Sequence, residues 1–181
     1  MAARTGIGAP ELERWARQHL RAGGRVLDLG CGTGFPVSWV LSKHEVEVFA
    51  IDSSPRMVAA FRERLPQLTV RCDDVFESDL YARAFDAVVM IGLVFLFDSE
   101  QQEALIGRAA RALKPGGRLL FTAPTQRARW VDALTGETNR SLGYTRYKAI
   151  IEASGLRIGG SFRDAGGNHH FDTVDTRRLA S

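Results

Sequence analysis

The chain has 181 residues, of which 45% are apolar and 25% are charged, and its formal net charge is +3. This length and composition are typical of one globular domain with a substantial hydrophobic core. The small positive surplus is spread along the chain, which excludes the clustered basic face of a nucleic-acid-binding protein.

Cysteine usage and hydropathy exclude further classes. Cys31 and Cys72 are the two cysteines, and neither belongs to a C-x-x-C pair, so we expect free thiols, no disulfide framework and no cysteine-based zinc site. No stretch approaches the roughly 18 apolar residues of a membrane span, and residues 1–10 lack the apolar core of a signal peptide. We therefore expect a cytoplasmic protein with no metal and no membrane partner.

Apolar runs alternate with helical patterns along the chain. We expect helices over residues 11–20, 36–42, 55–65, 99–113 and 144–154. We expect strands over residues 25–29, 46–51, 68–72, 85–91, 118–123, 156–162 and 169–174. Residues 126–143 read as a long, irregular connection, and such connections are usually functional. The alternation predicts an α/β fold with a mostly parallel sheet.

Two helix starts carry capping signals. Ser54 and Pro55 match an N-cap followed by a first-turn proline. Ser99 and Gln102 match a capping box. We therefore expect well-defined starts for these two helices.

A glycine-rich turn, Gly30-Cys31-Gly32-Thr33-Gly34, follows the first predicted strand. Glycine permits the unusual backbone angles of a tight turn and lets a ligand approach the main chain closely. In open α/β sheets, ligands bind at the carboxyl ends of the strands. A dinucleotide fingerprint requires G-x-G-x-x-G, whose last position here is Phe35. The sequence therefore disfavours a nicotinamide-dependent dehydrogenase.

Taken together, these motifs resemble the class I S-adenosylmethionine-dependent methyltransferase family. The run 28–34, Asp-Leu-Gly-Cys-Gly-Thr-Gly, is similar to the family's first motif, and Asp52 at the end of the second strand is similar to its second. Asp73, the run 85–89 and the turn 113–117 match later motifs in the same order.

The resemblance implies a Rossmann-like fold. We expect a seven-stranded, mostly parallel sheet with helices on both faces and a C-terminal antiparallel hairpin. It also implies one domain over 1–181, with an N-terminal helix (1–22), a cofactor-binding core (25–123) and a substrate-side loop, helix and hairpin (124–181).

The resemblance further implies S-adenosyl-L-methionine as cofactor and S-adenosyl-L-homocysteine as product. Asp28 and the Gly30–Gly32 backbone would hold the methionine end, Asp52 the ribose and Asp73 the adenine. The implied cofactor-binding residues are Asp28, Gly30, Cys31, Gly32, Asp52, Ser53, Met57, Asp73, Asp74, Val75, Ile91 and Gly92.

The acceptor side is less constrained. The [N/D]-P-P-[Y/F] motif of DNA and glutamine methyltransferases is missing from residues 90–97, which disfavours methylation of bases or of protein glutamine. The apolar residues of this stretch favour a small acceptor of apolar or aromatic character. Adjacent strand residues point to opposite faces, so at most one of His169 and His170 can face the cleft. The candidate substrate-binding residues are Phe95, Trp130, Asp132, Tyr144, Asn168 and His169, and the candidate catalytic residues are Asp132, Tyr144, His169 and His170.

We therefore expect an enzyme that transfers methyl to an O, N or S atom of a small molecule, as a monomer or homodimer. The main alternative is a non-catalytic module that binds S-adenosylmethionine as a sensor or partner subunit. An aminopropyl transferase would need an acidic groove after the fourth strand, and an arsenite methyltransferase would need several thiolates; the sequence favours neither.

Overall fold

The computed structural model describes residues 8–133 and 136–177 of the chain. Its helices are α1 (Ala9–His19), α2 (Val37–Leu41), α3 (Pro55–Arg64), α4 (Ser99–Arg111) and α5 (Tyr144–Ala153). Its strands are β1 (Arg25–Leu29), β2 (Glu47–Asp52), β3 (Thr69–Cys72), β4 (Phe85–Met90), β5 (Leu113–Thr122), β6 (Arg127–Val131), β7 (Thr138–Leu142), β8 (Leu156–Arg163) and β9 (His169–Asp175).

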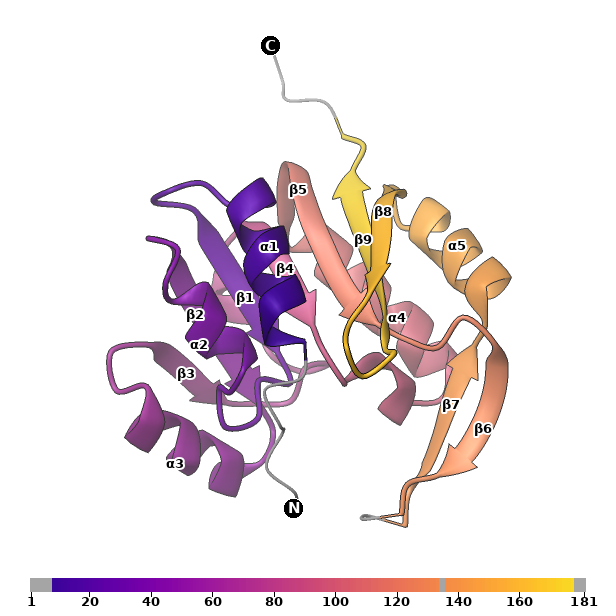
Figure 1. Ribbon diagram of the computed structural model, residues 1–181, viewed down its shortest axis with the longest axis horizontal. Coiled ribbons are helices and arrows are strands. Elements are labelled where there is room, and N and C mark those ends of the chain that lie inside the picture. The colour runs from indigo at the N-terminus through magenta and orange to yellow at the C-terminus, as the bar shows by residue number, and fades with distance from the viewer. Residues whose placement is uncertain (1–7, 134–135, 178–181) are drawn as a thin grey trace.

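Seven of these strands form one sheet in the order β3-β2-β1-β4-β5-β9-β8. Strands β1 to β5 pair in parallel, whereas β9 is antiparallel to both β5 and β8. The prediction of a mostly parallel, Rossmann-like sheet that ends in an antiparallel hairpin is confirmed (Figure 1).

The core lies on both faces of this sheet, as β4 illustrates. Val88 and Met90 belong to the apolar cluster that includes residues of α4 and α5. Ala87 and Val89 belong to the cluster that includes residues of α1 and α2. All four are fully buried, because successive strand residues point to opposite faces and helices cover each face. This two-sided burial explains the uninterrupted apolar run in the sequence.

The expected ends of most elements agree with the structure within two residues, and the Ser54 cap is confirmed, because its side chain accepts a hydrogen bond from the Met57 amide. Strand β5 is the exception. It begins at Leu113, a residue that we expected at the end of the preceding helix, because Leu113 pairs with Phe85 at the start of β4.

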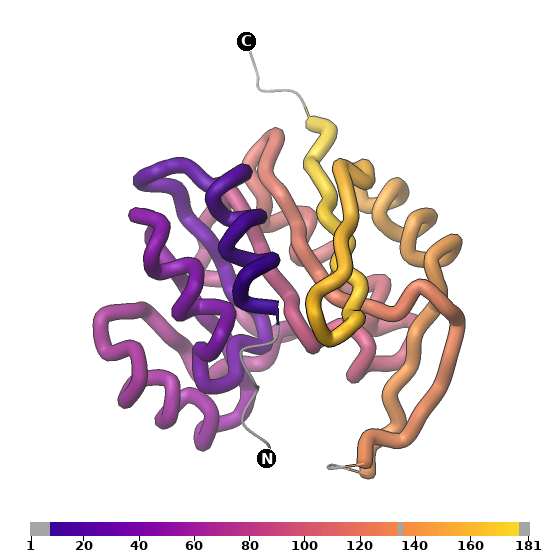
Figure 2. The backbone as a smooth tube through the Cα atoms, in the orientation of Figure 1, coloured from indigo at the N-terminus to yellow at the C-terminus, as the bar shows by residue number. Residues whose placement is uncertain are grey.

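The expectation of an irregular connection over 126–143 is wrong. Strands β6 and β7 form an antiparallel two-stranded sheet of their own, in which Trp130 pairs with Asn139. The hairpin stands away from the main sheet, at the end where the parallel strands finish (Figure 2).

The expected capping box at Ser99 and Gln102 is also wrong, by one residue. Asp98 and Gln101 form it, since the Asp98 carboxylate accepts from the Gln101 amide while the Gln101 side chain accepts from the Asp98 amide. Gln102 is fully buried and serves a different purpose.

Gln102 fastens the β6–β7 hairpin to the main body. Its side-chain nitrogen donates to the main-chain oxygens of Phe97 (2.9 Å) and Arg140 (3.1 Å). Its side-chain oxygen accepts from the Tyr147 hydroxyl (2.7 Å), which in turn accepts from the Leu142 amide (3.3 Å). One buried amide therefore joins α4, α5 and β7.

We expect Gln102→Leu to destabilise the fold by roughly 1–3 kcal/mol, because it leaves buried polar partners without hydrogen bonds. The free energy of unfolding from urea denaturation measures this change. Glu103→Gln is the matched control, since Glu103 is half exposed and pairs only with the exposed Arg146, so its effect should stay within about 0.5 kcal/mol. Equal stabilities of the two variants would contradict the account of the hairpin.

Candidate active site

Most of the predicted cofactor-binding residues lie at or just beyond the ends of β1, β2, β3 and β4. These parallel strands end at the same edge of the sheet (Figure 1). Strands β2, β1 and β4 lie side by side there, and the glycine turn follows β1. Carboxyl ends of parallel strands meet at one edge, which is where ligands bind in open α/β sheets.

The glycine turn is fixed to β2 by its main chain. The amides of Gly30 and Cys31 donate to the Ile51 oxygen at 2.8 and 3.1 Å. Gly30 and Gly32 have φ angles of +70° and +56°, which side-chain-bearing residues rarely adopt. A Cβ at Gly30 would lie 2.7 Å from Leu93, whereas a Cβ at Gly32 would meet open space. The turn thus presents main chain to an open region.

Asp52 completes this cradle. Its Oδ2 accepts from the Gly32 amide (2.8 Å) and its Oδ1 accepts from the Ser54 amide (2.9 Å). A carboxylate has about four lone-pair positions, so it can accept further hydrogen bonds from a ligand. The Asp73 amide donates to the Asp52 main-chain oxygen (3.1 Å), so two predicted cofactor-binding carboxylates stand on neighbouring strand ends.

Asp28 differs from this pattern because it is 1% exposed. Its Oδ2 accepts from the Ser38 hydroxyl at 2.7 Å, a contact between β1 and α2 that the sequence reading missed. Its expected role at the methionine end stays a prediction.

The other predicted cofactor-binding residues differ in exposure. Val75 and Cys31 are buried, Asp74 and Ser53 are exposed, and Met57, Ile91 and Gly92 are intermediate. The Gly92 amide donates to the Thr122 hydroxyl (2.7 Å), which joins the end of β4 to the end of β5. Thr122 is 4% exposed and also lines a neighbouring pocket, so this bond connects the predicted cofactor side to that pocket.

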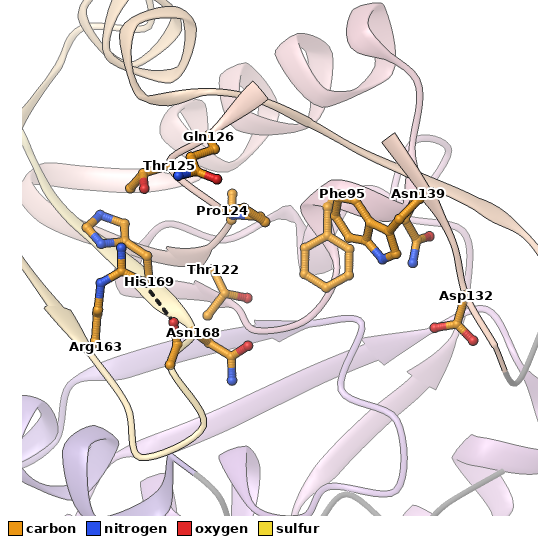
Figure 3. A pocket seen from close by; sticks show the side chains of 13 residues that line it. Phe95, Thr122, Pro124, Thr125, Gln126, Asp132, Asn139, Arg163, Asn168 and His169 are labelled. Atoms are coloured by element: carbon orange, nitrogen blue, oxygen red, sulfur yellow. Dashed lines mark hydrogen bonds between the residues drawn. The ribbon is translucent and has the colours of Figure 1, made fainter. Parts of the chain in front are cut away.

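That pocket has a volume of about 500 Å³ and lies between the end of β5, the β6–β7 hairpin and the β8–β9 turn (Figure 3). Its lining residues are Phe95, Thr122, Ala123, Pro124, Thr125, Gln126, Trp130, Asp132, Asn139, Arg163, Gly167, Asn168 and His169.

Five of the six candidate substrate-binding residues share this pocket: Phe95, Trp130, Asp132, Asn168 and His169. Tyr144 does not line it. The Tyr144 ring is 42% exposed and stacks on Phe171, with ring centroids 5.8 Å apart. Tyr144 is therefore a weak candidate for contact with an acceptor in this pocket.

The two adjacent histidines point in different directions, as the strand alternation required. His169 lines the pocket, and its ring meets Phe171 edge-on at 4.6 Å. His170 is 2% exposed, stacks on Phe162 and has Nε2 3.1 Å from the Asp164 carboxylate. His170 supports the β8–β9 hairpin, which leaves His169 as the histidine that can meet a ligand.

Burial lowers the pKa of His169, and the positive charge of Arg163 lowers it further. Burial also lowers the pKa of His170, although Asp164 opposes that shift. Burial and the charge of Arg118 lower the pKa of His19. The folded state therefore favours neutral imidazoles at these three positions.

Thr122 and Arg163 are pocket residues that the sequence reading missed. Thr122 follows three apolar residues, 119–121. A hydroxyl-bearing residue at the carboxyl end of a buried strand could have been recognised in the sequence as a candidate for ligand contact. Arg163 carried no such signal, because only the β8–β9 turn brings it to the pocket. Its guanidinium donates to the Gly167 oxygen at 2.9 Å.

Within residues 8–133 and 136–177, no group of three His, Cys, Asp or Glu side chains is placed to hold a metal ion. No helix in the same ranges is long and apolar enough to cross a bilayer.

Comparison with known proteins identifies the family. The family model described as "Methyltransferase domain" matches residues 26–117, which is half of the chain and includes the glycine turn and Asp52. This chain belongs to the methyltransferase domain family. The resemblance to class I S-adenosylmethionine-dependent methyltransferases is thereby confirmed.

Among curated relatives, the cypemycin N-terminal methyltransferase of a Streptomyces species is 37% identical over 110 residues, covering 59% of this chain and 44% of the relative. The trans-aconitate 2-methyltransferase of Variovorax paradoxus is 35% identical over 120 residues, covering 65% and 45%. The chain thus spans about half the length of the curated relatives it matches.

Solved structures agree on the fold. An amino pentose methyltransferase from Micromonospora echinaspora with bound S-adenosylmethionine has a TM-score of 0.75 at 19% identity, covering 93% of this chain and 90% of that one. The 1,6-didemethyltoxoflavin-N1-methyltransferase of Burkholderia thailandensis, with bound acceptor and S-adenosylhomocysteine, has a TM-score of 0.77 at 17% identity, covering 94% and 79%.

The lowered histidine pKa values predict a pH dependence of stability. A group whose pKa is lower in the folded state binds more protons when unfolded, so stability is complete above the unfolded pKa of about 6.5 and falls as the pH drops below it. We expect the free energy of unfolding to decrease from pH 7.5 toward pH 5.5 in urea titrations, and His169→Gln to reduce that decrease. A slope that His169→Gln does not alter would contradict the assignment.

Proposed function

We propose that this chain is a methyltransferase that uses S-adenosyl-L-methionine to methylate an O, N or S atom of a small molecule. The observation that carries this proposal is the open glycine cradle beside Asp52, joined to an acceptor-sized pocket through the Gly92–Thr122 hydrogen bond. Membership of the methyltransferase family supports it.

The residues present fit this cofactor. Open space above Gly32 leaves room for a ligand against bare main chain, and Asp52 and Asp73 offer acceptors for ribose hydroxyls and the adenine amino group. We assign the cofactor side to the loops after β1 to β4, and the acceptor side to residues 124–177. When bound, S-adenosylmethionine supplies an activated methyl group.

The chain itself then has two tasks. Asp52 and the glycine turn fix the position of the methyl donor, while Phe95 and Trp130 orient the acceptor, with ring centroids 5.6 Å apart. Such alignment can supply up to about 7–11 kcal/mol of the barrier to a two-reactant step. The β6–β7 hairpin covers one side of the pocket and helps to exclude water.

We also propose a cytoplasmic setting, with which two cysteines outside any disulfide are consistent. The remaining alternative is a module that binds the cofactor without turnover. The acceptor-sized pocket beside the cradle favours catalysis over that alternative, because a sensor requires no second cavity. Formation of S-adenosylhomocysteine with a broad panel of small acceptors, followed by mass spectrometry, separates the two.

We expect S-adenosylmethionine to raise the melting temperature of the protein by mass action. Asp52→Ala should weaken the cofactor's Kd about tenfold or more in calorimetry, from the loss of charge-assisted hydrogen bonds that contribute roughly 1.5–3 kcal/mol. Asp52→Asn, which retains one acceptor oxygen, should be affected less.

Asp79→Ala is the control, since Asp79 is exposed, pairs with Arg71, caps the short helix that begins at Leu80 and is not one of the predicted cofactor-binding residues. It should bind the cofactor like the wild type. No stabilisation of the wild type at millimolar cofactor would contradict the proposed function, and unchanged binding by Asp52→Ala would contradict the assignment of the ribose site.

A further inference from the structure

His169 is a pocket residue with an unusual polar environment. Its Nε2 is shielded from water and has no hydrogen-bond partner among the described residues. The residue as a whole is only partly buried and lines the pocket, so a ligand bound there can contact the exposed part of the imidazole.

The strand order places His169 close to the expected methyl position. Gly92 follows β4, Thr122 ends β5 and His169 begins β9, and these three strands are neighbours. The Ala123 amide donates to the His169 main-chain oxygen at 3.2 Å. Neighbouring strands lie about 4.8 Å apart, so His169 is two strand spacings from Gly92, within reach of an acceptor of ordinary size.

Arg163 stands beside His169 at the same end of the pocket (Figure 3). One of its N–H groups donates to the Gly167 oxygen. A guanidinium carries five N–H donors, so others are available to a ligand. This end of the pocket therefore combines a proton acceptor with a fixed positive charge.

Aromatic side chains occupy another part of the pocket. Phe95 and Trp130 lie close together. Thr122 lies between Phe95 and His169 (Figure 3). A ring packed on Phe95 and Trp130 would extend across Thr122 toward His169.

We infer, on the basis of the proposed function, that the acceptor is a phenol whose ring packs on Phe95 and Trp130 and whose hydroxyl gives its proton to His169. His169 is then a catalytic residue, and Arg163 stabilises the phenolate oxygen. Burial lowers the pKa of His169, so its imidazole is neutral near pH 7, and the phenolate formed beside it would stabilise the imidazolium that the proton transfer creates.

The charges around His169 favour a phenol over other acceptors. Arg163 repels an ammonium group but attracts an oxyanion, which disfavours an amine. A carboxylate is already ionised at neutral pH and requires no base. The other titratable groups nearby are His170, which lies on the opposite face, and Asp132, which lines the part of the pocket beyond Phe95 (Figure 3).

The proposed reaction is a displacement at the methyl carbon of the cofactor. The hydroxyl proton moves to the imidazole, the phenolic oxygen forms a bond to the methyl carbon, and the carbon–sulfur bond of the donor breaks with its electron pair left on sulfur. The products are an aryl methyl ether and a thioether, and the imidazolium returns its proton to water.

The test uses 4-nitrophenol, whose phenolate absorbs visible light, with the full chain and S-adenosylhomocysteine present. In the wild type, we expect the bound probe to ionise at lower pH than the free probe. His169→Gln should abolish most of this shift, and Arg163→Gln should weaken binding of the phenolate about tenfold, the effect of one charge-assisted hydrogen bond. Thermal unfolding of each variant checks that it is folded.

Two controls make the result specific. 4-Nitroanisole cannot ionise, so it should bind wild type and His169→Gln equally. Arg129→Gln should behave like wild type, because Arg129 precedes Trp130 in β6 and points to the opposite face. Binding of S-adenosylhomocysteine without binding of 4-nitrophenol, or equal ionisation in wild type and His169→Gln, would overturn this inference and leave the proposed function intact. Failure to bind either ligand would count against both.

Discussion

The Asp52 carboxylate accepts hydrogen bonds from the Gly32 and Ser54 amides, and this pair of contacts holds the site in shape. One contact reaches across from β2 to the turn after β1, and the other caps the turn that leads into α3. The parallel pairing of β1 with β2 makes them possible, because it brings both strand ends to one edge. A single side chain thus fixes the main chain that a ligand would meet and still has lone pairs to offer that ligand.

The acceptor pocket depends on a different kind of support. Its walls come from a hairpin outside the main sheet and from the β8–β9 turn, and neither is held by the central core alone. Gln102 joins the hairpin to α4 and α5, while Asp164 joins His170 to the β8–β9 turn through two hydrogen bonds from the Asn168 side chain. Buried side-chain networks therefore position this side of the site, whereas hydrogen bonds of Asp52 and of the main chain at the strand ends position the cofactor side.

The sequence predicted the fold well, since the fold depends on local signals such as apolar strands and glycine turns. The same signals, with acids at strand ends, selected the candidate cofactor-binding residues, whose roles stay predictions. It missed the β6–β7 hairpin because residues 138–142 lack an apolar face, and long-range hydrogen bonds such as that from Gln102 to Arg140 hold the hairpin in place. Two overlapping sequence patterns match a capping box, one that begins at Asp98 and one that begins at Ser99. The helix uses the first, because the Gln102 side chain that the second requires is buried. Arg163 lies at the pocket because of the β8–β9 turn, and no local sequence pattern predicts the geometry of that turn.

A crystal structure of the full chain with S-adenosylhomocysteine tests the central claim most directly. The account predicts that the nucleoside lies against the Gly30–Gly32 main chain, that both ribose hydroxyls contact Asp52, and that the sulfur faces the pocket beside Thr122. A crevice closed by the protein's own side chains, or a nucleoside bound elsewhere with Asp52 remote from its sugar, would contradict it.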